Sequence, residues 1–255
     1  MGHGTGDGGC QMVGANARRF FADWDDVQTD EAVVIAKVAE GLVDKSRIVE
    51  VEHLDPATLP KRTVYHAFKR GFDIVGSAVA LVVLAIPMAM VAIAIKLDSP
   101  GPVLFRQERL GKDGKPFTLV KFRTMCVNAE QGGAQWALDG DPRVTKLGRF
   151  LRDTRFDEVP QFWGVIKGDL SIVGPRPERK VFYNEFCKYI HGFDQRMMVR
   201  PGITGLAQVE GGYDLLPEYK IVYDMRYIRE QNLLMDLRIL AKTVGVVLRG
   251  EWGRS

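Results

Sequence analysis

Two adjacent acids, Asp157 and Glu158, stand directly before Val159 and Pro160. Because proline is tolerated in the first turn of a helix, this order predicts that the acid pair lies at a helix start. Backbone N–H groups and the helix dipole at that position stabilise negative charge and keep a carboxylate ionised. An ionised carboxylate can act as a nucleophile or bind a magnesium ion. Taken alone, however, an acid pair here is usually no more than a helix-start signal.

Basic side chains accompany this pair in a pattern that suits phosphate binding. Arginines lie just upstream, and two stiff turns, residues 174–177 and 200–205, each present one more. Guanidinium groups bind phosphate oxygens in a bidentate manner, and a rigid turn fixes their direction. Such a set can hold a diphosphate while a metal ion neutralises developing charge, although any one of them taken singly is better explained as a solvated side chain. The candidates are Lys121, Arg123, Arg149, Arg152, Arg155, Arg176 and Arg200.

The most distinctive of the elements that would position these groups is residues 74–95, a segment that contains no charged side chain. About 20 apolar residues suffice for a helix to cross the hydrocarbon core of a bilayer. A buried core helix is the alternative, but so long an uncharged segment is rarely surrounded by protein on every side. We therefore expect residues 74–95 to enter a membrane.

Pro87 lies inside this segment and predicts a kink, since proline removes one backbone hydrogen bond and its ring clashes with the preceding turn. Lysines and arginines flank the segment on both sides, and positive flanks prefer the cytoplasm. We favour a re-entrant helix that enters and leaves by one leaflet over an ordinary kinked crossing. The flanking cations are Lys61, Arg62, Lys69 and Arg70 before the segment and Lys96, Arg106, Arg109, Lys112 and Lys115 after it.

The remaining elements predict a mostly helical α+β fold with a small β-hairpin. Residues 103–109 and 117–122 are strand-like, and glycines in the intervening 111–114 favour a hairpin connection. A loop is expected over 129–142, and an N-terminal amphipathic helix over 29–52 after a flexible glycine-rich tail. The other helical patterns cover residues 147–152, 159–166 and 181–193, and residues 217–248 form one or two further helices. Prolines 56 and 60 then suggest three parts: an N-terminal extension (1–60), a membrane helix (61–100) and a cytosolic catalytic domain (101–255).

Composition excludes several other classes of protein. The 255 residues are 46% hydrophobic, so the chain can bury a core, and the formal net charge of +3 gives no general argument for a polyanionic partner. The three cysteines are odd in number and lack metal or redox spacing, which suits a reducing compartment. The four histidines are scattered, and no zinc motif is present.

Six motifs in one order give the chain a specific resemblance to the bacterial sugar transferase family, the monotopic phosphoglycosyl transferases. They lie at residues 69–73 (KRGFD), 99–103 (SPGPV), 121–125 (KFRTM), 157–161 (DEVPQ), 167–177 (KGDLSIVGPRP) and 200–209 (RPGITGLAQV). The resemblance runs from about residue 61 to about residue 248. Residues 1–60 lie outside the resemblance. Larger relatives carry additional N-terminal membrane spans that are not expected here, so the chain resembles the minimal form of the family.

The resemblance implies an enzyme that transfers a sugar-1-phosphate from a UDP-sugar to undecaprenyl phosphate and releases UMP. By position, Asp157 would be the nucleophile that forms a covalent phospho-sugar intermediate. Glu158 would assist through Mg²⁺ bound by both acids, or as a general base. The phosphate-binding residues would be Lys121, Arg152, Arg176 and Arg200, and the residue pattern adds Arg123 as a candidate substrate-binding residue.

The family also implies a setting. The reaction would be the first membrane step of exopolysaccharide, O-antigen, capsule or glycoconjugate assembly, at the cytoplasmic face of the bacterial inner membrane. Membrane lipid, downstream glycosyltransferases and a second copy of the chain are the expected partners, and nucleic acid is not.

Two positions depart from the family pattern. Ile86 stands before the helix-breaking Pro87 where serine is common, and Arg155-Phe156 precedes the acids where Ser-Leu is common. Two other readings compete with the enzyme. One is a catalytically dead scaffold that recruits other assembly proteins, which the intact acid pair disfavours. The other is a single-span protein whose soluble domain has an unrelated function, with its two ends on opposite sides of the membrane.

Overall fold

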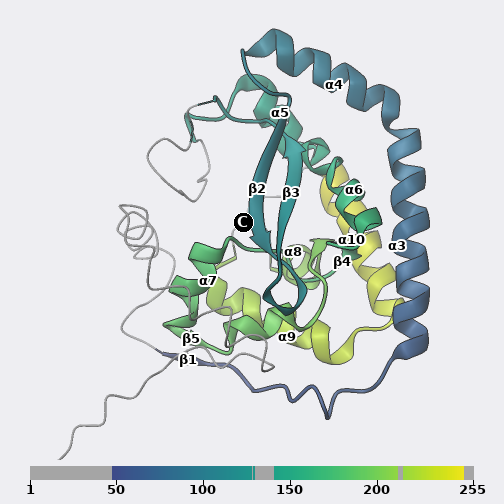
Figure 1. Ribbon diagram of the computed structural model, residues 1–255, viewed down its shortest axis with the longest axis vertical. Helices are drawn as coiled ribbons and strands as arrows, with labels where there is room; N and C mark the ends of the chain where they lie inside the picture. The colour runs from purple at the N-terminus through teal and green to yellow at the C-terminus, as the bar shows by residue number, and fades with distance from the viewer. Residues whose placement is uncertain (1–47, 128, 130–140, 212–214, 250–255) are drawn as a thin grey trace, which may run out of the picture.

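The computed structural model describes residues 48–127, 129, 141–211 and 215–249. These residues form a mostly helical α+β fold with a few short strands, as the sequence predicts. Figure 1 shows a long bent helix pair, α3 and α4, that curves around the outside of the other elements. The helices of the inner part are α5 (Lys146–Asp153), α6 (Gln161–Lys167), α7 (Lys180–Cys187), α8 (Leu206–Glu210), α9 (Pro217–Glu230) and α10 (Leu233–Arg249).

The bent pair consists of α3 (Thr63–Val83) and α4 (Ala85–Asp98), which meet at Leu84 with a bend of 60°. Pro87 explains the position of the bend, because its missing N–H leaves the carbonyl four residues earlier, at Val83, without its helical partner. Helical bonding resumes when the Met88 amide donates to the Leu84 carbonyl at 2.8 Å. Among the described residues no single helix is long and apolar enough to cross a membrane, whereas the bent pair qualifies by length and composition when taken together.

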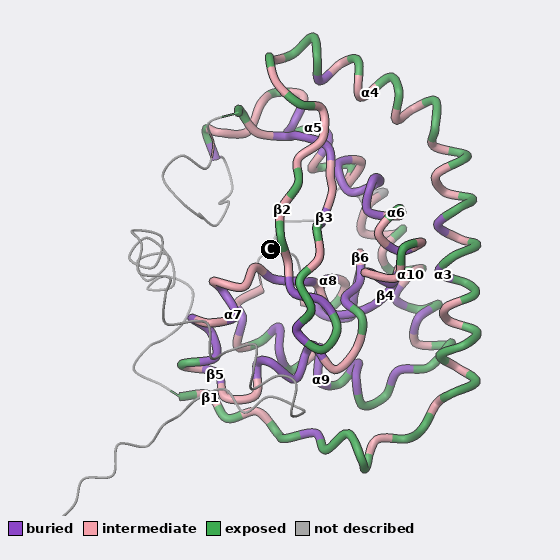
Figure 2. The backbone as a smooth tube through the Cα atoms, viewed as in Figure 1, coloured by how far each residue is buried: buried purple, intermediate pink, exposed green. Residues whose placement is uncertain are grey.

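The face of α3 that points toward the inner part is polar. Its buried residues are Asp73 and Ser77, and Asp73 accepts hydrogen bonds from the Ser171 hydroxyl at 2.8 Å and the Ile172 amide at 3.0 Å. Figure 2 shows that much of the pair is exposed or only partly buried, and the large side chains exposed on its outer face are apolar. Its exposed side chains include Val64, Phe68, Val75, Val79, Val82, Val83, Ile86, Met90, Ile93 and Leu97. This arrangement inverts the usual amphipathic pattern of a helix on a water-soluble domain.

Strands β2 (Leu104–Leu110) and β3 (Pro116–Phe122) form the predicted antiparallel hairpin. Its connection contains the short 3₁₀ turn η1 (Lys112–Gly114). Two parallel pairs were not predicted: β4 (Ser171–Val173) with β6 (Gly202–Thr204), and β1 (Val49–Glu50) with β5 (Ile190–His191).

The main hydrophobic core lies between α7, α9 and the 3₁₀ turn η3 (Phe193–Met198), around Phe186, Phe193 and Ile221. The helix predicted over 181–193 is therefore too long, because α7 ends at Cys187. Gly192 then takes a left-handed conformation, with φ 88°, that turns the chain into η3. The side chains of Phe182, Phe186, Ile190 and Phe193 in this segment are all buried in the core.

The described end of the predicted N-terminal extension belongs to this same core. Leu54 is buried among its residues, and the Leu54 amide donates to the Gln195 side chain at 2.6 Å. Residues 49–50 form β1, so the helix predicted over 29–52 does not extend that far. Residues 29–47 of that helix, the glycine-rich tail, and 130–140 of the predicted loop lie outside the described residues, and the division at residue 60 stays a prediction.

Candidate active site

The two acids lie in η2 (Phe156–Glu158), a 3₁₀ turn between α5 and α6, with Pro160 as the N-cap of α6. Arg155 begins this turn in a left-handed conformation, φ 57°, which non-glycine residues seldom adopt. Both acidic side chains are buried: Asp157 is 3% exposed and Glu158 is 6% exposed. The pair thus sits just before a helix, as expected, in a turn that removes it from water.

Burial raises the pKa of Asp157 to about 6, and the neighbouring charge of Glu158 adds to this effect. The cations Lys121, Arg155 and Arg152 act in the opposite direction without overcoming it. The helix-start argument from sequence expected a firmly ionised carboxylate. The difference arises because loss of solvent outweighs the short dipole of the seven-residue α6.

Glu158 behaves in the opposite way. Burial alone would raise its pKa, but the Arg176 guanidinium outweighs this and, with Arg155 and Lys121, lowers the pKa to about 2. Arg176 donates through both terminal nitrogens, Nη2 to Oε1 at 2.5 Å and Nη1 to Oε2 at 3.2 Å. One carboxylate is therefore held as an ion pair, whereas its neighbour can gain or lose a proton near neutral pH.

Arg176 owes its position to the close contact of two backbone segments. A Cβ atom at Gly202 would lie 2.1 Å from the Gly174 nitrogen, so only glycine allows β6 to approach the turn that carries Arg176. On the other side, the Arg176 carbonyl accepts a hydrogen bond from Arg196 at 2.8 Å. Arg196 is itself buried and paired with Asp224 at 2.6 Å. The backbone of Arg176 is thus fixed from both sides.

Lys121 and Arg152 approach the acids from β3 and α5. Gly148 lets α5 pack directly on the backbone at the end of the hairpin, since a Cβ there would lie 2.0 Å from the Thr124 carbonyl oxygen. Arg152 then donates from Nε to the Thr124 hydroxyl at 2.9 Å. The Lys121 ammonium lies 5.5 Å from the centre of the Phe105 ring, on the paired strand.

Two predicted phosphate-binding residues have other surroundings. Arg123 donates to the backbone carbonyls of Pro100 and Ser99, both at 2.7 Å, and so fastens the end of α4 to the hairpin. Arg200 lies beyond the far end of α6, where its Nε donates to the Gly168 carbonyl at 3.2 Å. The structure brings together Lys121, Arg152, Arg176 and the two acids, and it does not bring Arg123 or Arg200 to them.

The acid pair also has a feature that suits a divalent cation. The Oδ1 atom of Asp157 is buried, and no described residue offers it a hydrogen bond. Mg²⁺ is commonly held by one or two carboxylates together with substrate phosphates and water. Within the described ranges no group of three or more His, Cys, Asp or Glu side chains can hold a metal ion. The site therefore fits a magnesium ion that depends on the substrate for its other ligands.

Some neighbours of the acids had not been singled out from the sequence. Thr124 orients Arg152, and Gln161 is buried with its Nε2 atom unpaired among described residues. Both lie inside motifs of the family, which was the available signal. The left-handed backbone of Arg155 has no signal in composition or periodicity.

With this geometry in view, similarity to known proteins identifies the class. Residues 64–250 match the family described as bacterial sugar transferase. The match covers most of the chain, which therefore belongs to this family.

Individual relatives carry more specific names. The Aeromonas hydrophila "UDP-N-acetylgalactosamine-undecaprenyl-phosphate N-acetylgalactosaminephosphotransferase" is 42% identical over 219 residues, which are 85% of this chain and 52% of the relative. The "UDP-glucose:undecaprenyl-phosphate glucose-1-phosphate transferase" of Escherichia coli K12 is 43% identical over 190 residues, covering 72% of this chain and 41% of that protein. A protein of the same name from Caulobacter vibrioides is 37% identical over 219 residues, 84% and 82% of the two chains. This chain spans about half or less of the first two.

Proposed function

We propose that this chain is a phosphoglycosyl transferase, which moves a sugar-1-phosphate from a UDP-sugar to undecaprenyl phosphate and releases UMP. The observation that carries the proposal is the buried pair of unequal carboxylates among cations, in a member of the bacterial sugar transferase family. The names of the three relatives support both the donor class and the lipid acceptor.

In the proposed reaction the Asp157 carboxylate attacks the phosphorus that carries the sugar. A new oxygen–phosphorus bond forms, the bond to the bridging oxygen breaks, and UMP leaves with that oxygen. A phosphate oxygen of undecaprenyl phosphate then attacks the same phosphorus and displaces Asp157, which regenerates the carboxylate. Splitting the transfer in this way means that the polar donor and the lipid acceptor need not be bound together.

The surrounding residues have separate roles in this scheme. Lys121 and Arg152 face the charge that builds up on the phosphate oxygens. Arg176 keeps Glu158 ionised and fixed. The negative charge of Glu158 raises the pKa of Asp157, which opposes the lowering of that pKa by the surrounding cations. Asp157 and Glu158 would hold magnesium, which when bound supplies positive charge to the diphosphate.

We also propose that α3 and α4 form a re-entrant membrane helix on the cytoplasmic side. The apolar outer face, the bend beside Pro87 and the positive residues on both flanks support this arrangement. The acceptor lipid could then reach the acids from the bilayer, since Arg123 ties the end of α4 to the hairpin that carries Lys121.

The enzymatic proposal is tested by UMP release from a panel of UDP-sugars, with and without undecaprenyl phosphate. The native chain alone should release about one equivalent of UMP, because the first step needs no acceptor. Asp157→Asn should release none, and a chelator should abolish turnover. Asp153→Asn, an exposed acid at the end of α5, is the matched control and should behave as native. Release by the native chain only when acceptor is present would contradict the covalent intermediate, and no release from any donor would contradict the function.

The topology is tested by single cysteines at Lys61 and Lys115, which are exposed and flank the bent pair, in a chain otherwise free of cysteine. A membrane-impermeant maleimide should label neither position in intact cells and both after lysis. Labelling of only one position in intact cells would place the ends on opposite sides and contradict the re-entrant arrangement.

A further inference from the structure

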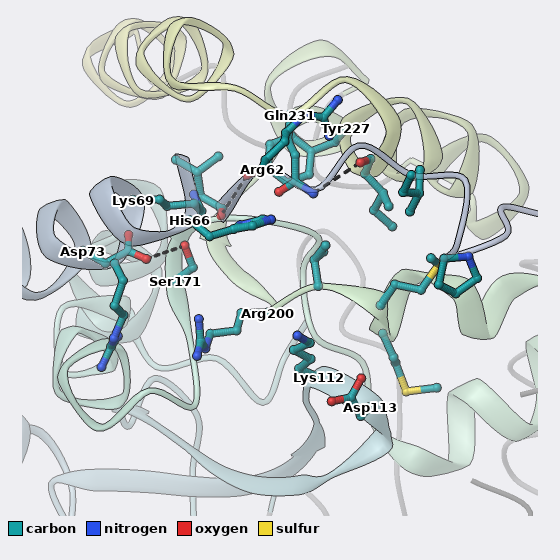
Figure 3. Close-up of a pocket in the computed structure, with 18 of the residues that line it drawn as sticks. Arg62, His66, Lys69, Asp73, Lys112, Asp113, Ser171, Arg200, Tyr227 and Gln231 are labelled. Atoms are coloured by element: carbon teal, nitrogen blue, oxygen red, sulfur yellow. Dashed lines mark hydrogen bonds between the residues drawn. The ribbon is translucent and has the colours of Figure 1, made fainter. Parts of the chain in front are cut away.

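A second site is suggested by a cavity of about 530 Å³ at the beginning of α3. Figure 3 shows Arg62, the N-cap of α3, with His66 and Lys69 of α3 on one side of it, facing Arg200 and Lys112 on the other. Its walls come from α3, the hairpin connection η1, the turn η3 and α9. None of Asp157, Glu158, Lys121, Arg152 and Arg176 lines it.

The cavity lies well away from the acid pair. Lys112 lies before β3, which begins at Pro116, and Lys121 lies five residues after Pro116 in the same strand. Five residues of extended strand span about 17 Å, so the backbones of Lys112 and Lys121 are at least about that far apart. The cavity therefore does not belong to the candidate active site.

The basic side chains of the cavity are held in place mainly by backbone carbonyl groups. Arg62 donates to the Arg229 carbonyl at 2.7 Å, Arg70 to the Val165 carbonyl at 2.6 Å, and Arg200 to Gly168. These bonds orient the guanidinium groups without cancelling their charge. Lys69 is the exception, since it pairs with Asp236 at 2.9 Å.

Acidic groups at the cavity do not offset this charge completely. Three acids line it: Asp73, Asp113 and Asp194. Five lysines and arginines line the same cavity, so the lining keeps a positive balance. The remaining positive field is visible at His66, whose pKa is lowered by partial burial and then by Lys112, Arg62, Lys69 and Arg200.

The other half of the cavity is apolar. Pro56, Leu59 and Pro60, from the segment before α3, line it together with Met197 and Met198 of η3 and the following Val199. The segment before α3 lies largely outside the part of the chain that matches the family, which begins at residue 64. A cationic half beside an apolar half recognises an anion with an apolar substituent.

We propose that this cavity binds a phosphate ester with an apolar substituent, held by Lys112, Arg62 and Arg200 through its phosphate and by the Leu59 and Met198 wall through the substituent. Guanidinium and ammonium groups are the common ligands of phosphate oxygens. The ligand that we infer is an anionic phospholipid, because its acyl chains are apolar and the cavity lies at the base of the exposed apolar helix pair. A soluble nucleoside monophosphate, whose substituent is polar, is the comparison.

The test follows the ring signals of His66 by NMR in the detergent-solubilised full chain. His66 lines the cavity, and His66→Gln identifies its signals among the four histidines. The probes are short-chain phosphatidic acid, UMP, inorganic phosphate and short-chain phosphatidylcholine. We expect saturable shifts with phosphatidic acid, and weaker binding of UMP, inorganic phosphate and phosphatidylcholine.

Variants separate this site from the acid pair. Lys112→Gln should weaken the apparent affinity about tenfold, the effect of losing one charge-assisted contact. Lys115→Gln, an exposed lysine of the same connection that does not line the cavity, should leave it unchanged. Asp157→Asn should also leave it unchanged, so failure of the proposed enzymatic function and failure of this site are distinguishable.

Four outcomes would overturn the inference: no saturable shift with phosphatidic acid, tighter binding of UMP than of phosphatidic acid, the same affinity in Lys112→Gln as in the native chain, or loss of the shift in Asp157→Asn. Equal affinity for inorganic phosphate and for the esters would remove the role of the apolar wall.

Discussion

The acid pair and the cavity at the base of α3 lie at opposite ends of the same two elements, α6 and the β2–β3 hairpin, and they handle charge differently. Acids precede the first turn of α6, whereas Arg70 and Arg200 bind carbonyls at its end. Each end thus carries the charge that the helix polarity favours. At the acid pair, two carboxylates with widely different pKa values are surrounded by the cations Lys121, Arg152, Arg155 and Arg176. At the cavity, the guanidinium groups of Arg62, Arg70 and Arg200 are bound to neutral carbonyls and stay available to a ligand.

The backbone contact between Gly174 and Gly202 connects the two sites, because Arg176 follows one glycine and Arg200 precedes the other. Gly202→Ala should therefore disturb both. Its Cβ would lie 2.1 Å from a backbone nitrogen that cannot move aside, and we expect a loss of about 3 kcal/mol in the free energy of unfolding. Gly71→Ala is the control: a Cβ there meets nothing within 4 Å, and alanine should stabilise α3 by about 0.5–1 kcal/mol. Thermal unfolding of both variants checks this, and equal melting temperatures would refute the role of the contact.

A smaller change breaks the charge balance of the acid pair alone. Arg176→Ala leaves Glu158 buried without its bidentate partner, so the Glu158 pKa should rise and the rate of UMP release should fall about 100-fold. Binding at the cavity should be unaffected. Arg226→Ala is the matched control, because Arg226 pairs with Glu230 on an exposed helix face where such pairs contribute little. Kinetics of UMP release give the comparison, and a native rate for Arg176→Ala would remove it from the site.

The smallest expected effect concerns stability. The raised pKa of Asp157 means that the folded state prefers the protonated form, so the fold loses stability as the pH rises from about 4, where the carboxyl ionises in the unfolded chain, and the loss is complete above about 6. Asp157→Asn should then be more stable than the native chain by roughly 1–3 kcal/mol at pH 7.5. The difference should disappear as the pH falls below about 4, where the carboxyl is protonated in both states. Denaturant titrations at several pH values measure it, and a less stable variant at pH 7.5 would contradict the sign.

Local patterns predicted the hairpin, α5, α6, α9 and α10, because alternation and helical periodicity are properties of contiguous residues. They did not predict β4 and β6, whose three-residue strands pair across about thirty residues of chain and leave no periodic trace. The helix expected over 181–193 failed at Gly192, where tertiary packing of Phe193 overrides an otherwise helical stripe.

The candidate site was predictable to a similar degree. The acid pair and its setting before a helix followed from Asp157, Glu158 and Pro160. The partners of the arginines did not, since type and spacing indicate a cation without indicating its neighbour. Arg123, Arg176 and Arg200 look alike in the sequence, yet one fastens α4, one pairs with Glu158 and one lines a separate cavity.

The inverted polarity of α3 has a practical consequence for protein engineering. Its inward hydrogen bonds are made by four polar side chains, Tyr65, Lys69, Arg70 and Asp73. Val75, Val79 and Val82 are exposed and take no part in them. Replacing the outward side chains with polar ones would therefore give an ordinary surface helix without changing the inward hydrogen bonds of α3. The outward side chains of α3 thus determine which solvent the helix can face, whereas its inward side chains hold it to the rest of the fold.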